Sequence, residues 1–197
     1  MPRTTEYNAA DHIEQTADAY TQPAFSRGNR LRRMLWNLAW WLLYRPSPRP
    51  AHAWRAAVLR LFGAKLGPHC HLYPGVRIWA PWNLECADHV AVADGAELYN
   101  PAPLTIGSHA IISQGAYLCG ATHDYNDPRF PLIAYRMSVG AFAWICARAS
   151  VLPGVKVGEG AVLGLGGVAN RDLAPWTVYF GNPAQSVRER NPGAANL

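Results

Sequence analysis

Cysteine is scarce in this 197-residue sequence, and its spacing argues against several kinds of site. The four cysteines stand far apart at positions 70, 86, 119 and 146, with no CxxC pair and no Cys/His spacing typical of a metal site. Such cysteines are expected to be reduced and buried as small hydrophobic side chains. The polar N-terminus lacks a secretory signal pattern. We therefore expect no metal, and a cytoplasmic protein that is either unattached or peripheral at the inner face of the membrane.

Charge is also low. Charged residues make up 16% of the chain, the formal net charge is +5, and only Lys65 and Lys156 among the 18 basic residues are lysines. Arginine favours forked contacts with phosphate and carboxylate groups. No dense basic run carries interleaved aromatic residues, so nucleic acid is not an expected partner. Because half of the residues are hydrophobic, we expect one folded domain with a substantial core.

A six-residue period runs through much of the chain. Aliphatic or small residues recur at Leu66, Leu72, Ile78, Leu84, Val90 and Ala96, then after a slip of four residues at Ile106, Ile112 and Leu118, and after a longer break at Val139, Ile145, Val151, Val157 and Leu163. The side chain four positions further on is usually small or short. This period is typical of a parallel β-helix built from hexapeptides, in which three hexads make one triangular coil. About 4.7 coils, each about 4.8 Å high, predict a prism roughly 22 Å long.

Composition divides the chain into segments. Residues 1–30 are polar and aperiodic, which predicts a loose N-terminal arm. Residues 31–64 contain two apolar helical patterns separated by a proline-rich linker, and they predict a helical cap. Residues 65–170 hold the hexads and are assigned to the β-helix, and residues 171–197 form a C-terminal segment.

The Trp-rich stretch at residues 31–44 has two interpretations. It begins with basic residues, continues as a dense apolar run, and is too short to span a bilayer. It can cap the open end of the β-helix, which would otherwise expose an unpaired sheet edge. It can also lie at a membrane surface as an amphipathic helix. We prefer the cap, and a peripheral membrane contact through the same stretch remains compatible with it.

His123 begins a segment that fits no hexad. Residues 123–138 are polar and contain two prolines, which predicts a loop extruded from one corner of the coil. Such loops commonly carry function. Asp124 follows His123, and a general base requires a partner that orients its imidazole ring. The spacing alone is also compatible with an ordinary surface histidine.

Three stretches resemble a known enzyme family. Residues 153–184, which end in FGNPA, resemble the closing segment of the hexapeptide-repeat acetyltransferases, a group that includes the galactoside, maltose and nodulation acetyltransferases. Residues 55–67 and 112–132 are similar to the colanic acid biosynthesis branch of that family, and so is the Trp-rich helix. The resemblance implies an all-β solenoid: a left-handed parallel β-helix with N-terminal helical segments and an extruded loop. It further implies a homotrimer that binds acetyl-CoA between adjacent prisms and acetylates a sugar hydroxyl.

The resemblance also assigns residues to a site. The family's catalytic base falls on His123, with Asp124 beside it as a second catalytic candidate. Positions that contact the donor in the family fall on Trp144, Ala147, Leu165, Asn170 and Arg171, and the C-terminal Arg188 is expected to attract the coenzyme phosphates by its charge. Asp94 and Asn100, which are polar residues of the early coils, are the candidates for binding the acceptor.

The function implied by the resemblance is acetyl-CoA-dependent O-acetylation of a sugar during exopolysaccharide or surface-polysaccharide assembly, with an acceptor that is either soluble or lipid-linked. Two alternatives stay open at this point. A non-catalytic β-helix could serve as a scaffold or binding module. A metal enzyme of the γ-carbonic anhydrase type shares the coil architecture, but it needs three converging histidines, and the spacing of the seven histidines offers no such set.

Overall fold

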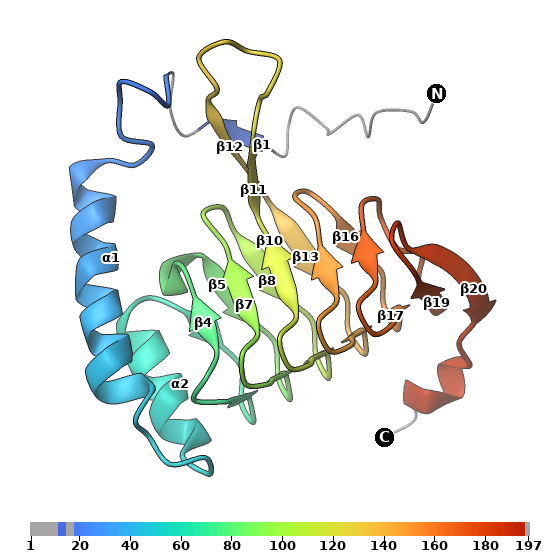
Figure 1. Cartoon of the computed structure of the whole chain (residues 1–197). Helices are drawn as coiled ribbons and strands as arrows, with labels where there is room; N and C mark the ends of the chain where they lie inside the picture. The colour runs from blue at the N-terminus through green and yellow to red at the C-terminus, as the bar shows by residue number, and fades with distance from the viewer. Residues whose placement is uncertain (1–11, 15–17, 196–197) are drawn as a thin grey trace.

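Three parallel sheets form the faces of a triangular prism in this computed structural model, which describes residues 12–14 and 18–195 (Figure 1). Face 1 contains β2 (Lys65–Leu66), β5 (Leu84–Cys86), β8 (Leu104–Ile106), β13 (Met137–Val139) and β16 (Lys156–Val157). Face 2 contains β3 (His71–Leu72), β6 (Ala91–Val92), β9 (Ile111–Ile112), β14 (Trp144–Ile145), β17 (Val162–Leu163), β19 (Thr177–Phe180) and β20 (Gln185–Glu189). Face 3 contains β4 (Arg77–Ile78), β7 (Glu97–Tyr99), β10 (Tyr117–Cys119), β15 (Ser150–Val151) and β18 (Val168–Ala169).

One aliphatic side chain per hexad fills the interior of the prism. On face 2, Leu72, Val92, Ile112, Ile145 and Leu163 follow one another in register, and all five are fully buried. Because neighbouring strands lie about 4.8 Å apart, these side chains stack in contact along the prism axis. The predicted fold class, a left-handed parallel β-helix with N-terminal helices and an extruded loop, is confirmed.

The hexad phase of the second coil differs from the prediction. The register places Cys86, Val92 and Leu98 over Leu66, Leu72 and Ile78, so the interior positions lie two residues later than the predicted Leu84, Val90 and Ala96. Two extra residues enter where the chain passes from face 3 to face 1, at the short 3-10 turn η3 (Pro81–Asn83) and again before Ile106. Val90 and Ala96 instead occupy corners, where they are also fully buried. Hydrophobicity alone therefore could not separate the two phases.

Two helical segments cover the first coil. Ser26 caps α1 (Arg27–Ala39), which continues as the π-helical turn η2 (Trp40–Tyr44), and α2 (His52–Leu61) follows the proline-rich linker. The indole Nε1 of Trp36 donates to the Ile78 carbonyl at 2.7 Å, and that of Trp40 donates to the Val76 carbonyl at 2.9 Å. Both rings are buried. The helices therefore close the N-terminal end of the prism (Figure 1).

A hairpin leaves the prism after β10. It consists of β11 (Ala121–His123) and β12 (Leu132–Tyr135), which are antiparallel, and the chain is back on face 1 at Met137. The hairpin therefore begins earlier than the predicted loop at 123–138, and it also ends earlier than that loop. The cause is that the hairpin begins with the small residue Ala121 and ends with the apolar strand β12, and both resemble coil residues in sequence.

The N-terminal arm is not loose over its described part, so that prediction is wrong for residues 12–14 and 18–26. The short strand β1 (His12–Glu14) pairs with β12 and adds a third strand to the hairpin. Ala19 N donates to the Arg129 carbonyl at 3.0 Å, and Phe25 packs against Trp79 with ring centroids 4.7 Å apart. The arm lacks periodicity because the contacts that hold it in place are with the hairpin and with the prism.

The C-terminal end extends face 2 beyond the predicted limit of the β-helix at residue 170. Strand β19 adds to β17 in parallel, and β20 returns antiparallel before the 3-10 turn η4 (Pro192–Ala195). Among the described residues, no helix combines the length and the apolar character needed to cross a membrane.

Candidate active site

His123 lies at the end of β11, where the hairpin leaves the prism. Its Nδ1 is 2.8 Å from the carbonyl oxygen of Phe130, and its ring stacks on the Phe130 ring with centroids 4.4 Å apart and an interplanar angle of 11°. A carbonyl oxygen can only accept, so Nδ1 carries the proton and Nε2 carries the lone pair. The hairpin thus fixes both the tautomer and the ring plane that a general base at Nε2 requires.

Asp124 does not orient this ring. Its Oδ1 accepts from Asn126 N at 2.9 Å, and its own backbone N donates to the Pro131 carbonyl at 3.0 Å. Both bonds hold the turn of the hairpin. The structure therefore gives the orienting role to the Phe130 carbonyl, and it gives Asp124, the second predicted catalytic residue, a role in shaping the turn.

Further polar contacts stiffen the hairpin tip. The Arg129 guanidinium forms an ion pair with Asp127, with Nη2 2.5 Å from Oδ2. Hydrogen bonds from Arg129 hold the pKa of Asp127 below its usual value. Arg129 also accepts the bond from Ala19 in the N-terminal arm. The tip that carries the Phe130 carbonyl is therefore held by contacts within itself and by the N-terminal arm.

The edge between faces 3 and 1 carries His123 and two of the predicted donor contacts. The hairpin leaves this edge after the third coil, and Asn170 and Arg171 lie on the same edge after β18, two coils further along. Arg171 is exposed and its Nη2 donates to Gln185 Oε1 on β20 at 3.3 Å. Arg188, another predicted donor contact, is exposed on the same strand. Both cations are therefore exposed at the C-terminal end of the prism.

The edge between faces 2 and 3 carries a column of corner residues that the corrected register reveals. Asp94, Gln114, Ala147 and Leu165 each stand two positions after an interior residue of face 2, so they follow one another from coil to coil. The Ala147 carbonyl accepts from Gly166 N at 3.1 Å, and the Leu165 side chain is exposed. The structure therefore brings predicted donor and acceptor residues onto one edge.

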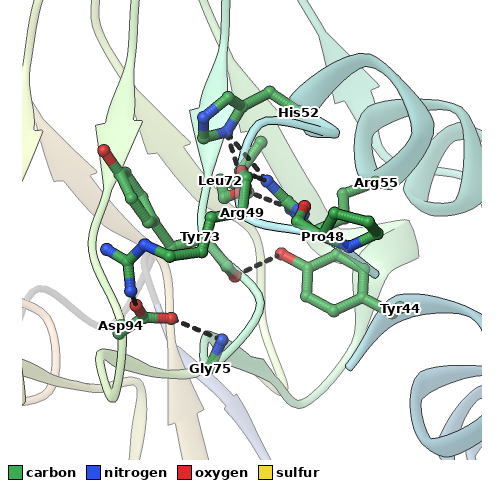
Figure 2. Close-up of polar contacts among 9 residues, drawn as sticks. All are labelled: Tyr44, Pro48, Arg49, His52, Arg55, Leu72, Tyr73, Gly75 and Asp94. Atoms are coloured by element: carbon green, nitrogen blue, oxygen red, sulfur yellow. Dashed lines mark hydrogen bonds and ion pairs between the residues drawn. The ribbon is translucent and has the colours of Figure 1, made fainter. Parts of the chain in front are cut away.

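Asp94 borders a groove of about 250 Å³ on face 2. Its Oδ2 lies 2.6 Å from Arg49 Nη1, and its Oδ1 accepts from Gly75 N at 2.7 Å (Figure 2). The remaining polar lining consists of Arg49, Tyr73, Ser113 and Gln114. Trp144 Nε1 donates to Ser113 Oγ at 2.9 Å, which places the predicted donor contact Trp144 beside this groove.

None of these lining residues was predicted from the sequence: Arg49, Tyr73, Ser113 and Gln114. Gln114 occupies the same corner position as Asp94 one coil later, so a correct hexad phase would have found it. Arg49 comes from the proline-rich linker, which the sequence presents only as a helix breaker. No signal in the sequence marked Tyr73 or Ser113.

Asn100 is placed differently from its prediction as an acceptor contact. It is 1% exposed, its Oδ1 accepts from Ala80 N at 3.0 Å, and its Nδ2 donates to the Ala80 carbonyl at 2.9 Å. Both polar atoms are therefore used to hold two neighbouring coils together where extra residues enter. This geometry contradicts an acceptor-binding role for Asn100.

One cluster of metal-ligating side chains occurs in the part of the chain that the structure describes. Ligand atoms of Asp88, His89 and His109 lie within 4.8 Å of one another on the edge between faces 1 and 2. The two imidazoles stack with an interplanar angle of 7°, and both Nδ1 atoms already have partners: Asp88 Oδ2 lies 3.0 Å from that of His89, and Ser108 Oγ lies 2.7 Å from that of His109. Hydrogen bonds from Ser108 and then His89 lower the pKa of Asp88 to about 2. The two histidines of the cluster therefore form part of a stack of rings along this edge, which we call the ladder.

Face 3 separates the two edges that carry the candidate residues. The chain crosses this face from the turn at Leu165–Gly166 through β18 to Asn170, and four steps of about 3.3 Å make the face roughly 13 Å wide. One acceptor sugar therefore cannot contact Asp94 and His123 of the same chain, since they lie on opposite sides of this face. The candidate residues on the two edges can therefore act together only through an extended ligand or through a second chain.

Comparisons with known proteins agree with the fold. No family model matches the chain. The chain is 37% identical over 166 residues to a protein of Escherichia coli (strain K12) that is named, provisionally, as the colanic acid biosynthesis acetyltransferase WcaF, and the match covers 84% of this chain and 91% of the relative. A hexapeptide-repeat acetyltransferase of Vibrio cholerae superposes with a TM-score of 0.77 at 22% identity, covering 84% and 94% of the two chains, and it has also been solved with acetyl-CoA. A galactoside acetyltransferase in complex with coenzyme A superposes with a TM-score of 0.72 at 18% identity, covering 86% of each chain.

Proposed function

The chain belongs to the hexapeptide-repeat acetyltransferases, and on that premise we propose that it transfers an acetyl group from acetyl-CoA to a hydroxyl group of a sugar or glycan in surface-polysaccharide assembly. The observation that carries the proposal is the orientation of His123, whose Nδ1–H is held by the Phe130 carbonyl. The name of the E. coli relative supports a polysaccharide acceptor, and the ligands of the structural neighbours support acetyl-CoA as donor.

In the proposed mechanism His123 acts as general base. Nε2 takes the proton of the acceptor hydroxyl while that oxygen bonds to the acetyl carbonyl carbon, and the carbon–sulfur bond of the thioester then breaks. The imidazolium returns the proton to the departing thiolate, which leaves as free coenzyme A. A backbone N–H of a neighbouring coil would stabilise the developing oxyanion. Acetyl-CoA supplies the activated acetyl group, and no cysteine is needed as a nucleophile.

The acceptor side of the proposal uses the groove beside Asp94. Its lining of Arg49, Tyr73, Asp94 and Ser113 combines an aromatic ring with charged and hydroxyl groups, which suits a polyhydroxylated ring. We propose that the acceptor is lipid-linked and that the enzyme works in the cytoplasm, at the inner face of the membrane. The donor would lie across Trp144, Ala147 and Leu165.

A closed threefold assembly is the first prediction. Asp94 and His123 lie on opposite edges of one prism, so a site in which one acceptor sugar contacts both residues needs a neighbouring chain, and closed symmetry is the usual outcome. Light scattering should give a mass close to three times the chain mass of 21.6 kDa. A stable and fully active monomer would be incompatible with this arrangement.

Arg171 should serve donor binding and not chemistry. It is exposed, so replacing it with alanine removes a screened attraction for a coenzyme phosphate. We expect Arg171→Ala to raise the KM for acetyl-CoA several-fold, with a smaller change in kcat, and the increase should shrink at high salt. Steady-state kinetics with Lys65→Ala as the control, an exposed cation at the other end of the prism, would check this. A fall in kcat alone would assign Arg171 to the chemical step.

The proposed function is tested by incubating the purified protein with acetyl-CoA and a panel of sugar acceptors. Release of free thiol that depends on one acceptor class is expected. A protein that releases no thiol above background with any polysaccharide precursor would instead be a binding module or scaffold.

A further inference from the structure

The helical cap exposes an apolar stripe on the side that faces away from the prism. Six large apolar residues of α1 and η2 are between 49% and 65% exposed: Leu31, Met34, Leu35, Leu38, Trp41 and Leu42. Their spacing of three, four and seven residues puts them on one side of a helix. Contiguous exposed apolar surface of this kind marks an interaction site. We call these six residues the outer stripe.

The opposite side of the same helix is fixed to the prism. Trp36 and Trp40 are buried and donate to carbonyl oxygens of the first coil, and Arg33 lies over the Trp79 ring at 4.1 Å. The helix therefore cannot turn its outer stripe inward. Its 18 residues span about 27 Å, and no helix in the described part of the chain can cross a bilayer. The outer stripe can only lie flat against whatever covers it.

The chain segment that contains the outer stripe carries charge of one sign. Residues 19–84 contain ten Lys and Arg residues and no Asp or Glu, while the rest of the chain contains eight basic and thirteen acidic residues. Arg27 and Arg30 are exposed at the beginning of α1, and Arg45 is exposed just after η2. The stripe is thus flanked by cations at both ends. This combination of an apolar face, an exposed Trp and flanking basic residues matches the interface of an anionic bilayer.

We propose that the outer stripe is a docking surface for an anionic lipid bilayer. The helix lies parallel to the bilayer surface, and its leucines and Trp41 insert into the bilayer. The surface is at the end of the prism opposite β20 (Figure 1). A groove of about 300 Å³ between η2 and the first coil is lined by Trp41, Arg45, Arg77 and Asp94, and it shares Asp94 with the candidate acceptor groove. A lipid-linked acceptor would therefore reach Asp94 directly from the bilayer.

The test uses the full chain and vesicles of defined composition, without acetyl-CoA or acceptor, so its outcome is independent of the proposed activity. Wild-type protein should co-sediment with phosphatidylglycerol-containing vesicles and bind phosphatidylcholine vesicles at least about tenfold more weakly. Leu38→Gln/Leu42→Gln should lower binding to the anionic vesicles by about tenfold or more, because two inserted side chains lose their apolar contact. Arg27→Gln/Arg30→Gln should lower it by a similar factor, and salt should mimic that loss.

The matched control is Val187→Gln on β20, an exposed apolar residue at the far end of the prism, which should bind vesicles as wild type does. Circular dichroism would show that each variant is folded. Three results would overturn the proposal: no binding of the wild type to anionic vesicles, unchanged binding of Leu38→Gln/Leu42→Gln, or a change in oligomeric mass of that variant without lipid. The last result would mean that a second copy of the chain covers the stripe.

Discussion

Replacing His123 with alanine is expected to lower kcat by a factor on the order of 10²–10⁴, because a positioned general base contributes about that much. The ring is held by one hydrogen bond and one stacking contact at the hairpin, so its loss should leave the prism intact. The KM for acetyl-CoA should change little, since the donor contacts proposed here come from other residues. Steady-state kinetics with the most active acceptor would measure both quantities.

Two control variants separate a base from a structural histidine. His109→Asn changes a ladder histidine whose φ of 59° asparagine tolerates, and it should keep most of the activity. Asp124→Asn should also keep most activity, because an amide oxygen can still accept the bond from Asn126 N. If His123→Ala matched the wild type, or if Asp124→Asn lost as much as His123→Ala, the assignment of the base and its orienting carbonyl would be wrong.

Replacing Arg55 with methionine is expected to lower the free energy of unfolding by about 3 kcal/mol or more. Arg55 is fully buried on α2. All five guanidinium N–H groups are used: Nε donates to the Leu72 carbonyl, Nη1 to Ser47 Oγ and the Pro48 carbonyl, and Nη2 to the Arg49 carbonyl and His52 Nδ1. Figure 2 draws Arg55 with all of these partners except Ser47. Methionine fills similar space but removes all five hydrogen bonds, and the buried Leu72 carbonyl loses its Arg55 donor. Chemical denaturation would measure the loss.

The same bonds connect stability to the candidate acceptor groove. By holding the linker carbonyls, Arg55 positions Arg49, whose Nη1 pairs with Asp94. Arg60→Met, on the same helix but exposed, should cost at most about 1 kcal/mol. Equal losses for the two variants would contradict a special role for the buried guanidinium.

The repeat could be predicted from the sequence because interior positions recur with a fixed period, as Val139 to Leu163 show. The phase of the second coil could not, since the corner residues Val90 and Ala96 are as apolar and as buried as the interior ones. Asn100, which the sequence analysis predicts to bind the acceptor, instead joins two coils through Ala80, and its burial could not be read from the sequence.

The hairpin shows a second limit of the sequence. His123 could be selected by its place next to a break in the period and by resemblance. Its orienting partner could not, because the Phe130 carbonyl is a backbone atom seven residues away and any residue would supply one. The docked arm was missed for the same reason: pairing of β1 with β12 depends on backbone groups and leaves little pattern in the side chains.

The measurement that tests the account most directly is acetyl transfer itself, followed with isotopically labelled acetyl-CoA, a lipid-linked glycan acceptor and mass spectrometry of the product. The account predicts one labelled acetyl ester on the glycan for each coenzyme A released, with no label on the protein and almost no product from His123→Ala. Label that accumulates on the enzyme, or coenzyme A release without an acetylated glycan, would contradict direct transfer to a sugar hydroxyl by His123.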